Sequence, residues 1–95
     1  MSFSVYILFS AKLSRFYTGT TDDVLRRLDQ HNAANYRGSF TAKGIPWELF
    51  LSIDDLGSEQ AYKIEQHIKS MKSKKYINDL KHYPEMIQKL KERFA

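Results

Sequence analysis

Residues 3–9 read FSVYILF, an alternating stretch with apolar side chains on both of its faces. Every second residue from Phe3 to Phe9 is apolar and falls on one face, while the other face carries Tyr6 and Leu8. A period of two with both faces apolar is typical of a strand that is covered on both sides. We therefore expect this stretch to be the central strand of a small sheet.

Two further stretches have the pattern of strands. Residues 15–19 follow a short polar turn, so they are expected to pair with residues 3–9 as an antiparallel hairpin. Residues 47–53 alternate again and predict a third strand. The connection before it, Asn32–Pro46, has no clear period and mixes aromatic side chains with cations. A connection of this length in a small domain is usually functional.

Apolar side chains at helical spacing predict four helices. The first follows a capping run, Thr20–Asp23, and extends to about Ala33. The second presents an apolar face over residues 61–71, the third begins at Ser73, and the last begins at Pro84. The sequence therefore predicts an α+β domain, with a three-stranded antiparallel sheet flanked by helices in the order β-β-α-β-α-α-α.

The composition excludes several classes of protein and of site. A chain of 95 residues fits one domain. Because it has no cysteine, it has no disulfide scaffold, thiolate zinc site or cysteine nucleophile. It also has no apolar run long enough to cross a membrane, and residues 1–4 lack the features of a signal peptide. We therefore expect a cytoplasmic protein with no membrane partner.

The positive charge is concentrated in the last third of the chain. Residues 63–95 hold nine Lys and Arg against four Asp and Glu, a net charge of +5, whereas residues 1–62 have a net charge of −1. An excess of this kind indicates a polyanion such as nucleic acid as the partner. The alternative interpretation is a well-solvated, lysine-rich helix surface.

The predicted fold could gather five polar side chains into a site. Tyr6 and Tyr17 lie on paired strands, so their phenols are expected to be neighbours. Arg27 and His31 are one turn apart on the first helix, and Glu65 borders the apolar face of the second. Each has a plainer interpretation: strand tyrosines usually pack in a core, and a helix glutamate commonly forms a surface ion pair with a lysine one turn later.

Seven short segments resemble the GIY-YIG nuclease family, in its small single-domain bacterial form. In chain order they are Val5-Tyr6-Ile7, Tyr17-Thr18-Gly19, Arg26-Arg27, Gln30-His31-Asn32, and residues 40–49, 61–69 and 74–77. The resemblance spans most of the chain, from Phe3 to Leu80. It implies a nuclease domain over residues 1–82, with residues 83–95 forming a basic helix packed on the same domain.

The resemblance also implies an active site, that of a metal-dependent endonuclease acting on DNA. By position in the motifs, Tyr6, Tyr17, Arg27 and Glu65 form it, and His31 lies near the scissile phosphate. Glu65 would hold Mg2+ (or Mn2+), which needs few protein carboxylates, and Arg27 would clamp the phosphate oxygens. A phenol is a poor base at its usual pKa of about 10 unless positive charge is near. Whether Tyr6, Tyr17 or His31 is the general base is left open.

The sequence departs from the family pattern at three places. Ser4 stands where the first motif has glycine, and Thr18 stands where the second has isoleucine. Neither side chain is expected to take part in the reaction. Thr20 occupies a position at which some DNA-repair members carry lysine, so any role of that lysine is lost here.

Seven basic residues are expected to contact nucleic acid: Arg26, Arg37, Lys43, Lys69, Lys72, Lys74 and Lys75. Target recognition could come from this surface or from a protein partner. The alternative function is a nucleic-acid-binding module that does little or no chemistry, and a third is a basic protein-interaction domain. DNA repair, mobile elements and restriction could all use such a nuclease, and the residues do not choose among them.

Overall fold

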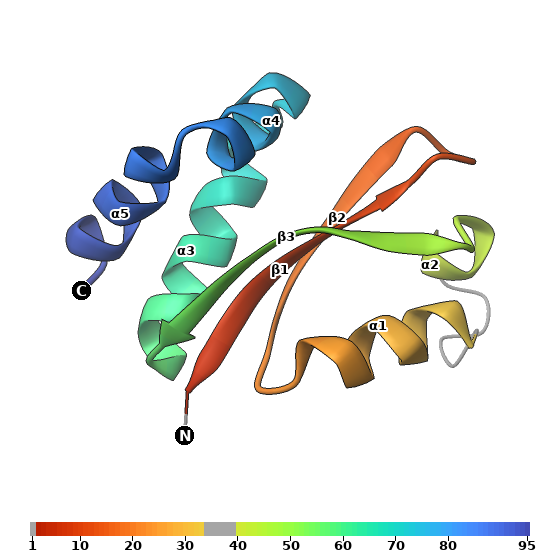
Figure 1. The fold of residues 1–95 in the computed structure, drawn as a ribbon, viewed down its shortest axis with the longest axis horizontal. Helices are drawn as coiled ribbons and strands as arrows, with labels where there is room; N and C mark the ends of the chain where they lie inside the picture. The colour runs from red at the N-terminus through yellow and green to blue at the C-terminus, as the bar shows by residue number, and fades with distance from the viewer. Residues whose placement is uncertain (1, 34–39) are drawn as a thin grey trace.

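The computed structural model describes residues 2–33 and 40–95, and it has the predicted α+β fold (Figure 1). In chain order the elements are β1 (Phe3–Ser10), β2 (Arg15–Thr21), α1 (Val24–Asn32), α2 (Phe40–Lys43), β3 (Trp47–Leu56), α3 (Ser58–Met71), α4 (Lys74–His82) and α5 (Pro84–Arg93). None of the helices in the described residues is long and apolar enough to span a membrane.

The three strands form one antiparallel sheet in the order β2-β1-β3, which confirms the hairpin and the central place of the first strand. Four consecutive residues of β1, from Val5 to Leu8, are at most 2% exposed. A strand that is paired on both edges and covered on both faces is expected to be buried to this extent. This burial explains why both faces of residues 3–9 are apolar.

The two faces of the sheet have separate cores. On one face Val5 and Ile7 pack with Ile64 and Ile68 of α3, in a cluster that also takes in α4 and α5. On the other face, a smaller cluster built on Tyr6 packs against α1. Figure 1 shows α3, α4 and α5 on one side of the sheet and α1 with α2 on the other. Alternation along β1 thus decides which helix each side chain meets.

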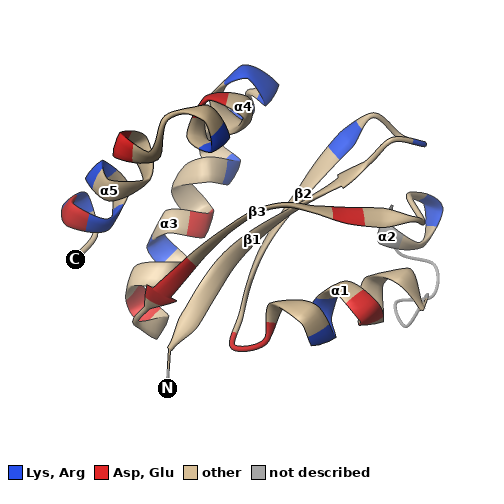
Figure 2. Cartoon of the chain, in the orientation of Figure 1, with Lys and Arg blue, Asp and Glu red and all other residues tan. Residues whose placement is uncertain are grey.

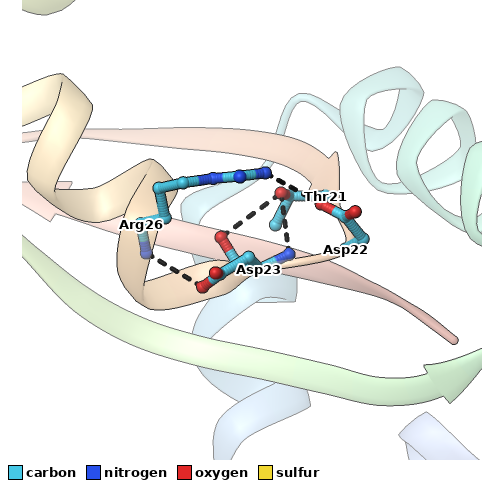
Figure 3. A network of polar contacts seen from close by, with 4 residues as sticks. All are labelled: Thr21, Asp22, Asp23 and Arg26. Atoms are coloured by element: carbon cyan, nitrogen blue, oxygen red, sulfur yellow. Dashed lines mark hydrogen bonds and ion pairs between the residues drawn. The ribbon is translucent and has the colours of Figure 1, made fainter. Parts of the chain in front are cut away.

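Local side-chain chemistry starts the helices where the sequence predicted. Asp23 is the N-cap of α1 and accepts a hydrogen bond from the Arg26 amide, while Thr21 accepts one from the Asp23 amide (Figure 3). Ser73 caps α4 in the same way, and Pro84 is the first residue of α5. Each cap satisfies an amide that the helix itself leaves without a partner.

The third strand is longer than predicted. It continues beyond Ile53 to Leu56, because Phe3 pairs with Leu56 after a shift in register. The Asp54 carboxylate accepts hydrogen bonds from Ser4 and Ser52, which tie this end of the strand to β1. These bonds also lower the pKa of Asp54. The acidic pair at 54–55, which follows the predicted strand, is therefore part of β3.

The connection between α1 and β3 contains the short helix α2, Phe40–Lys43, which the sequence pattern did not predict. Residues 34–39 of that connection lie outside the described residues. Its end is fixed by a cis Ile45–Pro46 peptide and by the hydroxyl of Ser10, which donates a 2.7 Å hydrogen bond to the Gly44 carbonyl. The start of β3 is thereby tied to the end of β1.

Candidate active site

Tyr6 and Gly19 face each other across β1 and β2. The phenol of Tyr6 lies directly against the glycine, so a Cβ built on Gly19 would come 2.5 Å from the Tyr6 hydroxyl oxygen. Such a contact is shorter than atoms tolerate without a shift, and the ring is only 2% exposed. The glycine of the second motif is therefore required for the tyrosine of the first to take its place.

Tyr6, Tyr17 and His31 form one cluster beneath α1. The Tyr6 hydroxyl and the His31 Nε2 are 3.2 Å apart and share a hydrogen bond. The Tyr17 ring lies with its edge toward His31, with centroids 4.8 Å apart, and the two phenol rings are 6.3 Å apart. The sequence prediction that the two tyrosines are neighbours is met, and His31 joins them.

Asn32, the residue after His31, joins the end of α1 to β3. The side chain of Asn32 accepts a 2.6 Å hydrogen bond from the Trp47 amide and donates one of 3.0 Å to the Trp47 carbonyl. This double contact fixes the end of α1 against the start of β3. His31 is consequently 2% exposed. Burial, and then the charge of Arg27, lower its pKa, so the imidazole is neutral near pH 7.

The three cluster residues and Arg27, which lies one turn before His31 on α1, differ in how much of the side chain is exposed to solvent. Tyr6 and His31 are each 2% exposed, whereas Tyr17 and Arg27 are half-buried. A group that contacts a phosphate or its attacking water must be reachable from outside. Tyr17 and Arg27 meet that condition, whereas Tyr6 and His31 are buried and do not.

Glu65 lies on α3, on the other side of β2 from this cluster. Its Oε1 accepts a 2.5 Å hydrogen bond from the Thr20 hydroxyl, and its Oε2 is 2.6 Å from the Lys69 ammonium. The Glu65 side chain is 13% exposed and that of Lys69 is 47% exposed. Both oxygens of the carboxylate therefore have partners. Thr20 is a site residue that sequence reasoning missed.

Two consecutive residues of β2 connect the two halves of the site. Gly19 lies against Tyr6 on the α1 side, and Thr20 bonds to Glu65 on the α3 side. Because successive residues of a strand point to opposite faces, the edge strand β2 stands between the aromatic cluster and the carboxylate. The structure thus brings Tyr6, Tyr17 and His31 into contact and sets Glu65 across one strand from them.

The basic residues that the sequence assigned to nucleic acid have different surroundings (Figure 2). Arg26 is paired with Asp22 at 3.2 Å (Figure 3), and Lys75 is paired with Asp79 at 2.8 Å. Lys43 is exposed on α2, and Lys69 is paired with Glu65. Lys72 and Lys74 line a hollow beside β2. Arg37 lies outside the described residues.

The donor set around Glu65 fits a hard divalent ion. Mg2+ keeps several of its waters and is commonly held by one or two carboxylates, so a single glutamate at the surface of α3 is chemically sufficient. Within residues 2–33 and 40–95, no group of three or more His, Asp and Glu side chains could form an all-protein metal cage. Each oxygen of Glu65 keeps lone pairs for an ion beside these contacts, but the positive charge of Lys69 at 2.6 Å opposes its binding.

The fold and the site define a class of protein. A tyrosine pair, an arginine and a carboxylate around the edge of a small antiparallel sheet are groups suited to phosphodiester chemistry. A family model described as the GIY-YIG catalytic domain matches residues 2–78, and the chain belongs to the GIY-YIG nuclease family. Nucleases of this family generally depend on a divalent metal. The comparisons with curated proteins and with solved structures gave no match.

Proposed function

We propose that this protein is a metal-dependent endonuclease that hydrolyses phosphodiester bonds in DNA and selects its substrate by structure. The observation that supports the proposal is the arrangement around β2. Gly19 receives the phenol of Tyr6 on one side, and Thr20 holds Glu65 on the other. Four of the five motif side chains, with Tyr17 and His31, thus gather around one short piece of backbone. Packing of the fold alone does not need a carboxylate with this support.

We assign the following roles to the side chains. Arg27, half-buried on α1, binds the non-bridging oxygens of the scissile phosphate with its planar fork of donors. Solvent reaches the Tyr17 side chain, so we assign it the role of general base: as a phenolate, its oxygen would accept the proton of the attacking water. Tyr6 and His31 lie behind it and hold its ring through the contacts of the cluster.

Glu65 is the residue that would hold Mg2+ or Mn2+. Bound there, the ion supplies a water of lowered pKa and positive charge for the phosphate. Thr20 orients the carboxylate through its hydroxyl, and Lys69 keeps it paired when no ion is present. The assignment of each role is independent of which DNA structure the protein prefers.

A second candidate function is a nucleic-acid-binding module with little or no catalytic activity. One observation favours it: both oxygens of Glu65 already have protein partners. If these contacts persist when DNA is bound, the Lys69 charge weakens metal binding at this carboxylate, and the positive surface is left as the functional part. In either case the proposed partner is DNA, with a protein partner for target recognition as a further proposal.

The domain limits, the cytoplasmic location and a role in DNA repair stay predictions. We propose residues 1–82 as the nuclease domain and residues 83–95 as a helix packed on it. Consistent with this, Leu90 of α5 is 5% exposed and belongs to the same core cluster as α3 and α4.

The test of function is cleavage of labelled DNA by the purified chain. Single-stranded, duplex, flap and branched DNAs are incubated with Mg2+, with Mn2+ or with EDTA. The endonuclease proposal expects products in metal that are absent in EDTA, with one DNA structure cut faster than the rest. Binding that weakens with salt but gives no product in any metal supports the binding module instead.

A further inference from the structure

A hollow of about 450 Å3 runs along β2 where it meets the end of α3 and the start of α4. Its rim is basic, with Arg15 on the strand side and Lys69, Lys72 and Lys74 on the helix side. Figure 2 shows the blue segments of β2 and of the α3–α4 connection at the same end of the molecule. No acidic residue is among the described residues that line it.

Two lysines of this rim, Lys72 and Lys74, differ from the ion-paired lysines on the same helices. Lys72 has an exposed side chain and no carboxylate partner within the described residues, and Lys74 donates a 2.6 Å hydrogen bond to the neutral carbonyl of Ser14. By contrast, Lys63 pairs with Glu59 at 3.1 Å and Lys75 pairs with Asp79 at 2.8 Å. Lys69 is paired with Glu65, but the charges of Lys72 and Lys74 are not neutralised by an ion pair within the described residues, and a site for an anion needs such charges.

The floor of the hollow is apolar. Phe16 of β2 and Ile68 of α3 line it, and the Phe16 ring is held in place by the Phe50 ring, with centroids 4.9 Å apart. Phosphate alone would need no apolar floor. A basic rim around an aromatic floor is the combination that binds the backbone and the base of an unpaired nucleotide. A hollow of this volume suits a small organic group, whereas a base within a duplex is paired and stacked and would have to leave the helix to enter it.

The hollow is continuous with the proposed active site. Tyr17 lines it and also packs against His31, and Lys69 lines it while pairing with Glu65. An occupant would therefore sit next to the phosphate that is cut. We propose that this hollow binds an unpaired nucleotide of the substrate strand, its phosphate on Lys72 and Lys74 and its base against Phe16. The inference rests on the proposed function and names the feature by which the substrate is selected.

The test measures binding without cleavage. A short fluorescent oligothymidylate and a blunt duplex are titrated with the full chain in EDTA, and anisotropy is read at several salt concentrations. The variants Lys72→Gln and Lys74→Gln are compared with Lys63→Gln, which removes equal charge from α3 at a residue that is paired with Glu59. Lys72 is exposed, so its variant is expected to stay folded even if Lys74→Gln loosens the turn at Ser14.

The proposal expects the two rim variants to weaken single-strand binding several-fold and to lower its salt slope by about 0.7 per lost phosphate contact. The binding of the control variant Lys63→Gln and the binding of the blunt duplex change little. Equal losses in rim and control variants, no loss in the rim variants, or a parent protein that does not bind the single strand would each overturn it. A protein that binds as expected but never cuts DNA would refute the endonuclease proposal and leave this one standing.

Discussion

The hydroxyl of Thr20 and the carboxylate of Glu65 are joined by a 2.5 Å hydrogen bond that connects the sheet edge to α3. Lys69 takes the other oxygen of the same carboxylate at 2.6 Å. These two contacts place the carboxylate of the candidate site beside β2, and they affect how readily it can accept a metal ion. An ion has to compete with a cation that is already in place, so Lys69 opposes metal binding at rest.

Replacing Lys69 with Met is expected to tighten metal binding at Glu65. An ion pair between residues four apart on a helix is worth about 0.3–0.5 kcal/mol, so Mn2+ affinity should rise at least about twofold. Direct titration of Mn2+ by electron paramagnetic resonance measures it without any cleavage. Lys63→Met is the matched control, since it removes the Glu59 partner from the same helix. Unchanged or weaker Mn2+ binding in Lys69→Met would exclude competition at this carboxylate.

Gly19→Ala is expected to destabilise the fold and disturb the aromatic cluster. The new methyl group would meet the Tyr6 phenol at 2.5 Å, in a place where the ring is buried against Tyr17 and His31. Overpacking of this kind costs about 1–3 kcal/mol in the free energy of unfolding, measured by urea denaturation. Gly57→Ala is the control, because nothing lies within 4 Å of its added carbon. Equal losses in the two variants would show that the close approach to Tyr6 carries no special cost.

The stability of the fold is expected to fall as the pH drops below about 6.5, the ordinary pKa of histidine. Burial, and then Arg27, lower the pKa of His31, so the folded chain binds fewer protons than the unfolded chain in this range. The free energy of unfolding then decreases with falling pH until the lowered folded pKa is passed. His67 contributes in the same direction, because burial, and then Arg93, lower its pKa too.

The contribution of His31 is isolated with His31→Gln. Urea unfolding of the parent and the variant is compared between pH 7.5 and pH 5, and the variant is expected to lose less stability over that interval. The part that persists in the variant belongs to His67 and the other titrating groups. Parallel curves for the two proteins would mean that His31 titrates normally in the folded state.

Much of the fold follows from local pattern. The alternation of residues 3–9 predicts a strand with cover on both faces, and Ser73 and Pro84 mark the starts of the last two helices. The extension of β3 to Leu56 and the short helix α2 were not predictable in this way. The first depends on a register shift against β1, and a helix of four residues is too short to have a period.

The site could be predicted only in part. The tyrosine pair follows from the hairpin, but alternation does not tell which phenol stays within reach of solvent. The contacts of Thr20 with Glu65 and of Asn32 with Trp47 join residues far apart in the chain, through side chains that are common on any surface. Their partners are set by how α3 and β3 pack on the sheet. No local signal in the sequence could have given them.

The most direct test of the central claim is the cleavage rate of Glu65→Ala beside that of Glu59→Ala. Both variants remove a carboxylate from α3, and Glu59 is an exposed residue paired with Lys63. Single-turnover cleavage of the preferred DNA in Mg2+ is measured together with DNA binding in EDTA. We expect Glu65→Ala to abolish cleavage while it keeps most of its binding, and Glu59→Ala to cut like the parent. Cleavage by Glu65→Ala at the parent rate would contradict the assignment of Glu65 as the metal-binding residue of a nuclease.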